Sequence, residues 1–338
     1  MEKMRLGGTG LQVSRCGFGA LPIQRLEQTP AVELLRHAYD QGINFFDTAR
    51  GYTDSEEKIG IALSPVRINI VLATKTPAKT RQGVQADLEK SLAQLQTDMI
   101  DVYQLHNPAE IPDPADPNSS YAALVEARQK GQIRFIGLTN HRLSTALAAA
   151  RSGLFDTIQF PLSLLSSAED LELISVCRQH DVGVIAMKAL SGGLLTHIPS
   201  AFAFLRQYPE VLPIWGMQRE SELEDFLRLE QHPPVLDAAM QAIIDKERSE
   251  LAGAFCRGCG YCLPCPAGIP IPMAARMTLL LSRSPAAKFL EKEWQDKMDL
   301  IDQCQHCGHC TSHCPYQLDT VALLEQNLAA YRAMIRHQ

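Results

Sequence analysis

The chain has 338 residues, of which 46% are hydrophobic and 21% are charged, and its formal net charge is −6 at pH 7. That length and apolar content suffice for one large domain and one small domain. The acidic balance, and the lack of a basic stripe with interleaved aromatic residues, exclude nucleic acid and anionic membrane surfaces as main partners. No run of residues is long and apolar enough to insert into a bilayer.

The chain opens with MEKMRLGGTGLQVS, which contains no apolar segment of the kind that directs export. We therefore expect a cytoplasmic protein. The run from Gly7 to Gly10 comes before any βα unit, and its glycines suit a tight turn. We interpret this run as a hairpin turn that caps the floor of the barrel predicted next.

From residue 15 to about 230, short β-branched runs alternate with helical patterns at intervals of about 25 to 30 residues, which is typical of repeated βα units. We predict eight strands, at 15–19, 43–47, 68–74, 99–104, 133–139, 157–160, 183–187 and 211–215. Amphipathic helices are predicted between them, for example at 31–41, 84–95 and 170–180. The fold class is α/β, a (β/α)8 TIM barrel. The competing fold, a doubly wound open sheet, normally has a glycine-rich phosphate loop after its first strand, and this chain has none.

Polar residues stand at the ends of three consecutive predicted strands. Asp47 ends the second strand and Tyr52 follows it, Lys75 ends the third, and His106 ends the fourth. In a barrel these strand ends meet at one mouth, where the chemistry takes place. A lysine that is partly neutralised by an aspartate lowers a tyrosine pKa from its reference near 10. We predict that Tyr52 is a general acid for a carbonyl oxygen.

The run Gln231-His232-Pro233-Pro234 ends the last barrel helix and marks a domain boundary. We assign residues 1–235 to the barrel and residues 236–338 to a small all-helical domain. Helices are predicted there at 238–251, 272–281, 285–294 and 318–335. The long insert between Cys265 and Cys304 favours a helical two-cluster ferredoxin-like fold over a compact hairpin ferredoxin.

Eight of the ten cysteines form two runs in this second domain: Cys256, Cys259, Cys262 and Cys265 before Pro266, and Cys304, Cys307, Cys310 and Cys314 before Pro315. Three cysteines at successive two-residue spacings reach three corners of a cubane, and a later Cys-Pro supplies the fourth corner, often on the neighbouring cluster. We therefore predict two [4Fe-4S] clusters with crossed ligation. Cys314 completes the set begun by Cys256, and Cys265 completes the set begun by Cys304. The first run departs from the usual pattern, because only two residues separate Cys262 from Cys265.

Two zinc sites are the alternative use of these cysteines, although zinc ribbons rarely repeat three CxxC steps with a Cys-Pro after each. A disulfide framework does not suit a cytoplasmic chain. His306, His309 and His313 lie among the second run, where we expect them to tune the redox potential or to face solvent. Cys16 and Cys177 lie in apolar stretches and are predicted to be buried hydrophobes.

Four segments of the barrel resemble the ordered motifs of the aldo-keto reductase superfamily: FDTARGYTDSEEKIG at 46–60, ATK at 73–75, DVYQLHNP at 101–108 and GLTNH at 137–141. With its cysteine-rich tail, the chain is similar to the bacterial branch that carries a C-terminal [4Fe-4S] ferredoxin-type domain. The resemblance implies that Tyr52 is the proton donor, that Lys75 and Asp47 tune it, and that His106 orients the substrate carbonyl.

The resemblance also implies a bound NADPH or NADH. Its carboxamide would meet Thr139, Asn140 and Gln159, and the other implied cofactor-binding positions are Gly19, Met187, Lys188, Gly216 and Arg219. The chain departs from the family here, with Met187 where an aromatic ring usually stacks on the nicotinamide. Arg219 suits a 2′-phosphate, whereas Glu222 opposes one, so the preference between the two nucleotides stays open.

The predicted function is nicotinamide-dependent reduction of a small aldehyde or ketone, with the clusters exchanging electrons with a ferredoxin or another redox protein, or sensing redox state. The two kinds of cofactor differ in the number of electrons that they transfer. A nicotinamide transfers two electrons as a hydride, whereas a [4Fe-4S] cluster transfers one, and the sequence shows no signature of a flavin that would link them. Two alternatives follow. The chain is an electron-transfer protein whose barrel docks a partner or binds another cofactor, or the clusters are purely structural.

Overall fold

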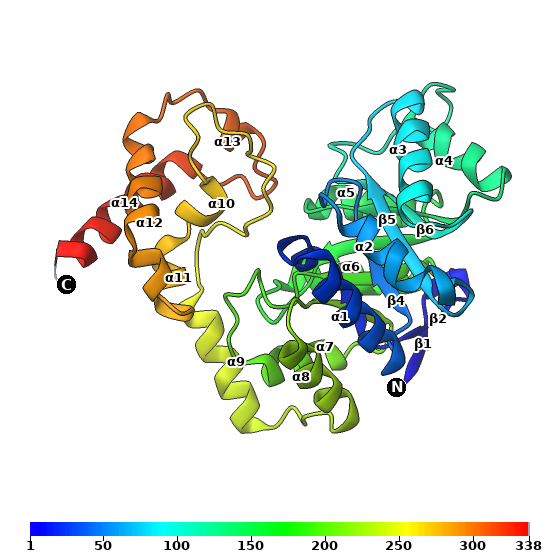
Figure 1. Cartoon of the computed structure of the whole chain (residues 1–338), viewed down its shortest axis with the longest axis horizontal. Helices are drawn as coiled ribbons and strands as arrows, with labels where there is room; N and C mark the ends of the chain where they lie inside the picture. The colour runs from blue at the N-terminus through cyan, green and yellow to red at the C-terminus, as the bar shows by residue number, and fades with distance from the viewer. Residues whose placement is uncertain (337–338) are drawn as a thin grey trace. The chain divides into compact units, whose positions relative to one another are not determined.

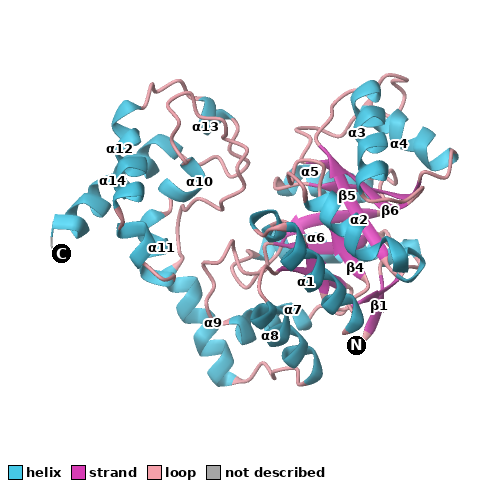
Figure 2. Ribbon diagram, in the orientation of Figure 1, coloured by secondary structure: helices cyan, strands magenta, loops and turns pink. Residues whose placement is uncertain are grey.

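The structure is a computed structural model that describes residues 1–336. The chain forms two compact units. The first comprises Met1–Ala189 and Pro199–Asp237, and the second comprises Leu190–Ile198 and the residues from Ala238 onward. Figure 1 follows both units by residue number, and Figure 2 shows helices and loops through the second unit.

Eight parallel strands of the first unit close into a barrel in the order β10-β3-β4-β5-β6-β7-β8-β9. They are β3 (Gly17–Gly19), β4 (Phe45–Asp47), β5 (Val71–Thr76), β6 (Ile100–His106), β7 (Ile133–Thr139), β8 (Thr157–Pro161), β9 (Gly183–Met187) and β10 (Val211–Gly216). The predicted (β/α)8 barrel is confirmed, and the predicted bounds of β7 and β9 match the structure.

Helices follow the strands as the alternating pattern predicts. They are α1 (Gln28–Asp40), α2 (Ser55–Leu63), α3 (Arg81–Gln94), α4 (Ser120–Gln129), α5 (Leu143–Arg151), α6 (Ala168–Gln179), α7 (Ile198–Arg206) and α8 (Glu220–Gln231). The short 3-10 turns η2 (Pro22–Arg25) and η3 (Ser64–Asn69) add to them. Several helices begin earlier than their apolar pattern predicts because a polar side chain caps them. Thr80 accepts a hydrogen bond from the Gly83 amide at α3, and Ser167 forms a capping box with Asp170 at α6.

Four predicted strands begin too early, at residues 15, 43, 68 and 99, whereas the observed strands begin at Gly17, Phe45, Val71 and Ile100. Residues 68 and 69 belong to η3, and the Ile68 side chain is 94% exposed, so hydrophobicity alone misplaced the start of β5. The guanidinium of Arg67 donates to the carbonyls of Ile70 and Met99 at 3.1 and 2.7 Å, which holds this turn against the bottom of the barrel. Residues 15 and 16 likewise precede β3, although Cys16 is fully buried as predicted.

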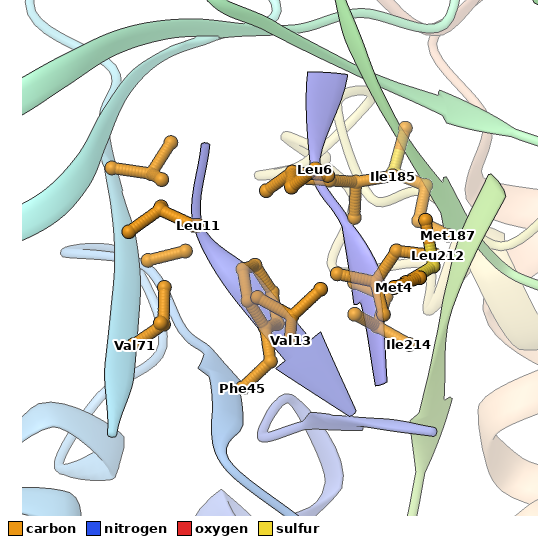
Figure 3. Close-up of a cluster of buried hydrophobic side chains, with 12 residues drawn as sticks. Met4, Leu6, Leu11, Val13, Phe45, Val71, Ile185, Met187, Leu212 and Ile214 are labelled. Atoms are coloured by element: carbon orange, nitrogen blue, oxygen red, sulfur yellow. The ribbon is translucent and has the colours of Figure 1, made fainter. Parts of the chain in front are cut away.

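An N-terminal hairpin closes the floor of the barrel. Strand β1 (Lys3–Arg5) pairs antiparallel with β2 (Gln12–Ser14) through the turn η1 (Gly7–Thr9), as expected. Figure 3 shows its apolar side chains packed with buried residues of β4, β5, β6, β9 and β10, in a cluster of Met4, Leu6, Leu11, Val13, Phe45, Val71, Ala73, Val102, Ile185, Met187, Leu212 and Ile214. Gly7 has φ +48°, and a Cβ atom there would lie 2.2 Å from the Gly183 amide nitrogen. Only glycine therefore permits this close contact.

The second unit is helical with long loops, as predicted. Its elements are α9 (Ala238–Glu250), α10 (Ile271–Ala274), α11 (Met277–Arg283), η4 (Ala287–Leu290), α12 (Lys292–Asp299), η5 (Leu300–Gln303), α13 (His309–Ser312) and α14 (Thr320–Arg336). Two predicted helices are wrong as single elements. The backbone of Arg276 (φ −139°) separates α10 from α11, and extended Glu291 (ψ 157°) separates η4 from α12.

Buried polar bonds join the helices of this unit. Asn327 on α14 accepts from the Thr278 amide at 3.0 Å and donates to the Ala275 carbonyl at 3.2 Å. The Tyr331 hydroxyl donates to the Phe289 carbonyl at 2.5 Å. These bonds fix α14 against α11 and η4 because a buried polar group must find a partner.

The segment Leu190–Ile198, which follows β9 in the chain, groups with the second unit. Arg276 donates to the Gly192 carbonyl at 3.2 Å, and Arg283 donates to the Leu194 carbonyl at 3.1 Å. The division elsewhere falls between Asp237 and Ala238. Among the described residues, no helix combines the length and apolar character needed to cross a membrane.

Candidate active site and cluster sites

Three of the predicted catalytic residues lie on neighbouring strands of the barrel. Asp47 ends β4, Lys75 is the penultimate residue of β5, and His106 ends β6. The strands pair in the order β4-β5-β6. Because parallel strands all end at one rim, adjacent strand ends bring these side chains together.

Asp47 and Lys75 form a buried ion pair. Lys75 Nζ lies 2.7 Å from Asp47 Oδ2, and the two side chains are 0% and 3% exposed. The ammonium also donates to the Thr48 carbonyl at 2.6 Å. Burial lowers the pKa of Lys75 and raises the pKa of Asp47, while their mutual attraction opposes both shifts. The pair is thus held in one geometry by its own hydrogen bonds.

A group of buried amides and one hydroxyl surrounds the carboxylate. Gln104 Nε2 and Gln159 Nε2 each lie 3.4 Å from an Asp47 oxygen. The Thr139 hydroxyl lies 2.8 Å from Gln104 Oε1 and 3.2 Å from Gln159 Oε1. Sequence reasoning missed Gln104, although a glutamine inside the apolar strand DVYQLH is a visible signal, since a buried amide needs partners.

Tyr52 lies beside the ion pair and beside His106. Its ring centroid is 5.3 Å from Lys75 Nζ and 6.0 Å from the His106 ring, which meets it edge-on. The loop that carries Tyr52 is tied to β5, because the amides of Thr48 and Arg50 donate to the carbonyls of Ala73 and Lys75 at 2.8 and 2.9 Å. The four predicted catalytic residues, Asp47, Tyr52, Lys75 and His106, therefore lie together in one site.

Two imidazoles at this rim are neutral at ordinary pH. Burial, together with the Lys75 charge, lowers the pKa of His106 from 6.5 to about 3. Burial also lowers the pKa of His141 well below 6.5, with help from Lys188 and His106. His141 is 6% exposed and lies in the GLTNH motif, but sequence reasoning gave it no role. A neutral imidazole still offers one N–H donor to a carbonyl oxygen.

A second buried carboxylate supports the Tyr52 loop from below. Glu56 is 1% exposed and accepts from Arg50 at 2.5 Å, from the Thr74 hydroxyl at 2.7 Å and from the Ser91 hydroxyl at 2.8 Å. Lys58, on the same helix, donates to the carbonyls of Ile23 and Leu26 at 3.1 and 2.6 Å. The sequence run SEEK gave no hint that two of its charges are interior.

The implied cofactor positions lie on the upper rim with the cluster. Four of them end strands, namely Gly19 on β3, Thr139 on β7, Met187 on β9 and Gly216 on β10, and Gln159 lies two residues before the end of β8. Asn140 donates to the Pro108 carbonyl at 2.8 Å. The Met187 side chain, however, packs into the buried cluster with Leu212 rather than replacing a stacking aromatic ring (Figure 3). Lys188 follows with φ +57°, an unusual conformation for a residue with a side chain.

The first turn of α8 binds its own carboxylate. Glu222 Oε2 accepts from the amides of Gln218 and Arg219 at 2.8 and 3.2 Å, and Glu222 Oε1 lies 3.4 Å from Arg219 Nε. The Arg219 side chain is 69% exposed. The Glu222 carboxylate therefore already accepts hydrogen bonds from the amides at the positive end of this helix.

Two cavities in the second unit are lined by cysteines from both runs. One is lined by Cys256, Cys259, Cys262 and Cys314, and also by Cys310. The other is lined by Cys304, Cys307, Cys310 and Cys265, and also by Cys262. Each cavity thus contains three cysteines of one run and the last cysteine of the other run, which is the arrangement that crossed ligation requires.

The donor set of the cavities suits iron–sulfur clusters. Thiolates are the usual ligands of such clusters, and each cavity offers at least four sulfur atoms with no carboxylate in its lining. The Gly258 amide lies 3.3 Å from Cys256 Sγ, so a backbone N–H already donates to one candidate ligand. Within residues 1–336, no three histidine, cysteine or acidic side chains are grouped so as to hold a single metal ion.

Two family models match the chain in succession. The model for the aldo/keto reductase family matches residues 15–201, and the model for a 4Fe-4S dicluster domain matches residues 255–319. The fold and these matches define an oxidoreductase barrel followed by an iron–sulfur domain. The chain belongs to the aldo/keto reductase family, since the first match covers more than half of its residues.

Relatives and solved structures agree with this assignment. The chain is 30% identical over 213 residues to the uncharacterized oxidoreductase YqkF of Bacillus subtilis, which is 59% of this chain and 68% of that protein. It is 29% identical over 273 residues to the NADH-specific methylglyoxal reductase of Escherichia coli, covering 70% and 81% of the two chains. The alignments with YqkF and with the aldo-keto reductase YhdN of B. subtilis span about two thirds of those relatives, at 68% and 64%.

Solved structures also match most of this chain. The holo form of aldo-keto reductase AKR11C1 from Bacillus halodurans superposes with a TM-score of 0.65 at 23% identity, over 73% of this chain and 96% of that chain. A putative aldo-keto reductase from Pseudomonas aeruginosa gives 0.59 at 27% identity, over 67% and 93%. The first of these supports the fold alone, because its sequence identity is low.

Proposed function

We propose that the barrel reduces a small aldehyde or ketone with a nicotinamide cofactor, and that the second unit binds two [4Fe-4S] clusters. The observation that carries the first part is the buried Lys75–Asp47 pair beside the half-buried Tyr52 ring, with Lys75 Nζ 5.3 Å from the ring centroid. A positive charge at that place stabilises the phenolate that forms as Tyr52 gives up its proton.

Each of the catalytic residues in the barrel then has one role. Tyr52 transfers its hydroxyl proton to the carbonyl oxygen as charge develops there. His106, which is neutral, donates its N–H to the same oxygen and fixes the direction of approach. Asp47 holds Lys75 in place and balances its charge, because a lone ammonium in this interior would lose its proton.

The polar residues of the rim suit a nicotinamide. Gln159 and Asn140 offer amide groups, and the 3.4 Å distance from Gln159 to Asp47 is long for a hydrogen bond, so this amide can turn toward a carboxamide. The bound nicotinamide would supply the hydride that the side chains lack. We further propose NADH over NADPH, because Glu222 already occupies the amides of the α8 turn and repels a 2′-phosphate.

The test of the barrel activity is the variant Tyr52→Phe, assayed anaerobically with a simple aldehyde and with NADH or NADPH. We expect a loss of kcat of about 10²–10⁴-fold, the usual contribution of a general acid, with unchanged iron content. Tyr39→Phe is the matched control, because the Tyr39 hydroxyl lies on α1 and accepts a surface hydrogen bond from Asn69 at 3.3 Å. Full activity of Tyr52→Phe would contradict the assignment.

The test of the cluster assignment is chemical analysis of protein purified without oxygen. Two complete sets of four thiolates predict about eight iron and eight sulfide per chain. Zinc without sulfide would contradict it. This result does not depend on the Tyr52 assay. Carbonyl reduction by the barrel and cluster binding by the second unit can therefore each be contradicted without the other.

A second function has two observations in its favour. Met187 packs into the core and Glu222 caps α8, so two parts of the usual cofactor cradle are changed. In that case the chain is an electron-transfer protein whose barrel binds a partner or another cofactor. Fluorescence titration with NADH separates the two, because only the reductase is expected to bind the nucleotide.

A further inference from the structure

The two cysteine-lined cavities differ in charge. Arg257 lines the cavity of Cys256, Cys259, Cys262 and Cys314, which we call the Cys256 site. The cavity of Cys304, Cys307, Cys310 and Cys265, the Cys304 site, is lined by no lysine or arginine among the described residues. Its polar lining consists of the side chains of Gln305, His306 and His309, with Gly308.

Aromatic rings hold the Arg257 guanidinium in place. Its central carbon lies 3.6 Å from the centroid of the Phe255 ring and 5.7 Å from that of Tyr316. Stacking on an aromatic face orients a guanidinium and limits its motion. The charge is therefore a fixed feature of the Cys256 site.

A second guanidinium supports the same side. Arg276 is 8% exposed and donates to the Gly192 carbonyl at 3.2 Å. It lies against Gly258, where a Cβ atom would be 3.0 Å from the guanidinium carbon. Gly258 has φ +63°, and its amide donates to Cys256 Sγ at 3.3 Å. Two cations and one N–H donor thus converge on the Cys256 end of this site.

Within the described part of the chain, no cation is left over beside Cys304 to match Arg257. Asp302 comes two residues before Cys304, and its carboxylate shares Arg332 with Asp299, each at 2.5 Å, so this group of three carries a net negative charge. Cys307 belongs to the exposed residues, whereas Cys256, Cys259 and Cys314 are half-buried and Cys262 is buried. The two cavities share Cys262, Cys310 and Ile271 in their linings, so the sites are neighbours.

We propose that Arg257 makes the two cluster sites unequal, so that the first electron added to the protein resides at the Cys256 site. This inference depends on the proposed binding of two [4Fe-4S] clusters. Reduction adds one negative charge to one site, and a fixed guanidinium beside that site stabilises the added charge. A low-potential one-electron donor supplies the electron. The electron enters at the Cys304 site, through the exposed loop around Cys307, and passes from there to the Cys256 site.

The experiment is an anaerobic redox titration of the full-length protein with dithionite, followed by electron paramagnetic resonance. For Arg257→Gln we expect about tenfold less reduced Cys256 site at a fixed solution potential, with the Cys304 site changed less than about twofold. Arg257→Lys keeps the charge and should recover most of the difference. Phe255→Leu removes the ring that positions the guanidinium and should give a smaller change in the same site.

Two further variants complete the design. Cys307→Ser alters the signal of the Cys304 site and so identifies which signal belongs to which site. His306→Gln replaces another polar side chain of the Cys304 lining and should leave the order of reduction as it is. Equal shifts of both signals, or no shift with Arg257→Gln, would overturn the inference.

Iron and sulfide analysis separates this failure from failure of the proposed function. Protein with no clusters contradicts both proposals. Protein with about eight iron, whose two sites are reduced together in the wild type and in Arg257→Gln, contradicts the role of Arg257 alone.

Discussion

The barrel and the cysteine-rich unit hold their candidate sites by different means. Around Asp47 and Lys75 the chain supplies every partner itself, through an ion pair at 2.7 Å, a backbone carbonyl and buried amides. Around the cysteines the chain supplies ligands that line two cavities, and helices α10 and α13, which lie in the segments that line them, have only four residues each. The first site is organised by protein packing, whereas the second needs a bound group to fill it.

The strongest test of this comparison is removal of the clusters. We expect the loops of the second unit and helices α10 and α13 to lose nearly all protection from hydrogen exchange, since little else holds the eight cysteines together. The barrel strands should keep their protection, because their core does not involve the clusters. The measurement is hydrogen exchange by mass spectrometry, before and after anaerobic oxidation and chelation of iron.

Equal loss of protection in β3–β10 and in α10–α13 would contradict the comparison. So would a second unit that keeps its protection without iron. In either case the clusters would not be the element that organises this unit.

A second test removes one partner of the buried ion pair in the barrel. Lys75→Met leaves the Asp47 carboxylate buried without its cation, which should destabilise the barrel by about 3–5 kcal/mol. The double variant Lys75→Met with Asp47→Asn should recover much of that loss, because no unpaired charge is left. Both variants should lack carbonyl reduction. The measurement is thermal unfolding of the barrel by circular dichroism.

Lys90→Met is the matched control, because Lys90 is an exposed residue of α3. It should change stability by less than about 0.5 kcal/mol. If the single Lys75 variant and the double variant unfold at the same temperature, the ion pair is not what holds the site.

The third test concerns the crossed cysteines. Cys314→Ser should damage the cluster at the Cys256 site, although Cys314 comes from the other run, and Cys265→Ser should damage the Cys304 site. The reason is that each cavity contains three cysteines of one run and the last cysteine of the other. Electron paramagnetic resonance and iron content measure the loss, and the reverse pattern would show that each run binds its own cluster.

The smallest expected effect is a pH dependence in the barrel. His141 is 6% exposed, and its pKa lies well below 6.5, so the unfolded chain takes up a proton below pH 6.5 that the native barrel does not. Stability should therefore fall as the pH drops below about 6.5, by up to about 1.4 kcal/mol per pH unit. His141→Asn should remove this contribution and so reduce the slope between pH 7 and 5, as measured by thermal unfolding, while His106, whose pKa is lowered to about 3, keeps its own contribution.

His180→Asn is the control, because His180 is exposed at the end of α6. It should leave the slope unchanged. An unaltered slope in His141→Asn would show that other groups control the acid stability.

The order of elements along the barrel was predictable from the sequence. Period and spacing of apolar runs located eight strands. Asp47, Lys75 and His106 stood at strand ends, and Tyr52 stood in the loop after one of them, where a barrel gathers side chains. The errors fell on segments where one long-range bond overrides local preference. Ile68 reads as a strand residue, but Arg67 binds Met99 across the barrel floor and keeps that segment in a turn.

Other features had no local signature. Glu56 and Lys58 read as surface charges of SEEK, yet both are buried, because their partners lie on α3, on β5 and in the loop after β3. The segment 190–198 reads as a barrel loop, but its carbonyls bind Arg276 and Arg283 from far along the chain. Such assignments depend on residues that are distant in sequence.

By itself the sequence determined the fold class, the two-part organisation and the chemical type of both candidate sites, because these follow from hydrophobic period and from ligand spacing. Only the tertiary structure decided which side chains meet. It placed Gln104 at Asp47, turned Met187 into the core, capped α8 with Glu222, and put Arg257 at one cavity and not at the other. The physical reason is that burial and charge pairing depend on the three-dimensional surroundings of a residue, which its neighbours in the chain do not specify.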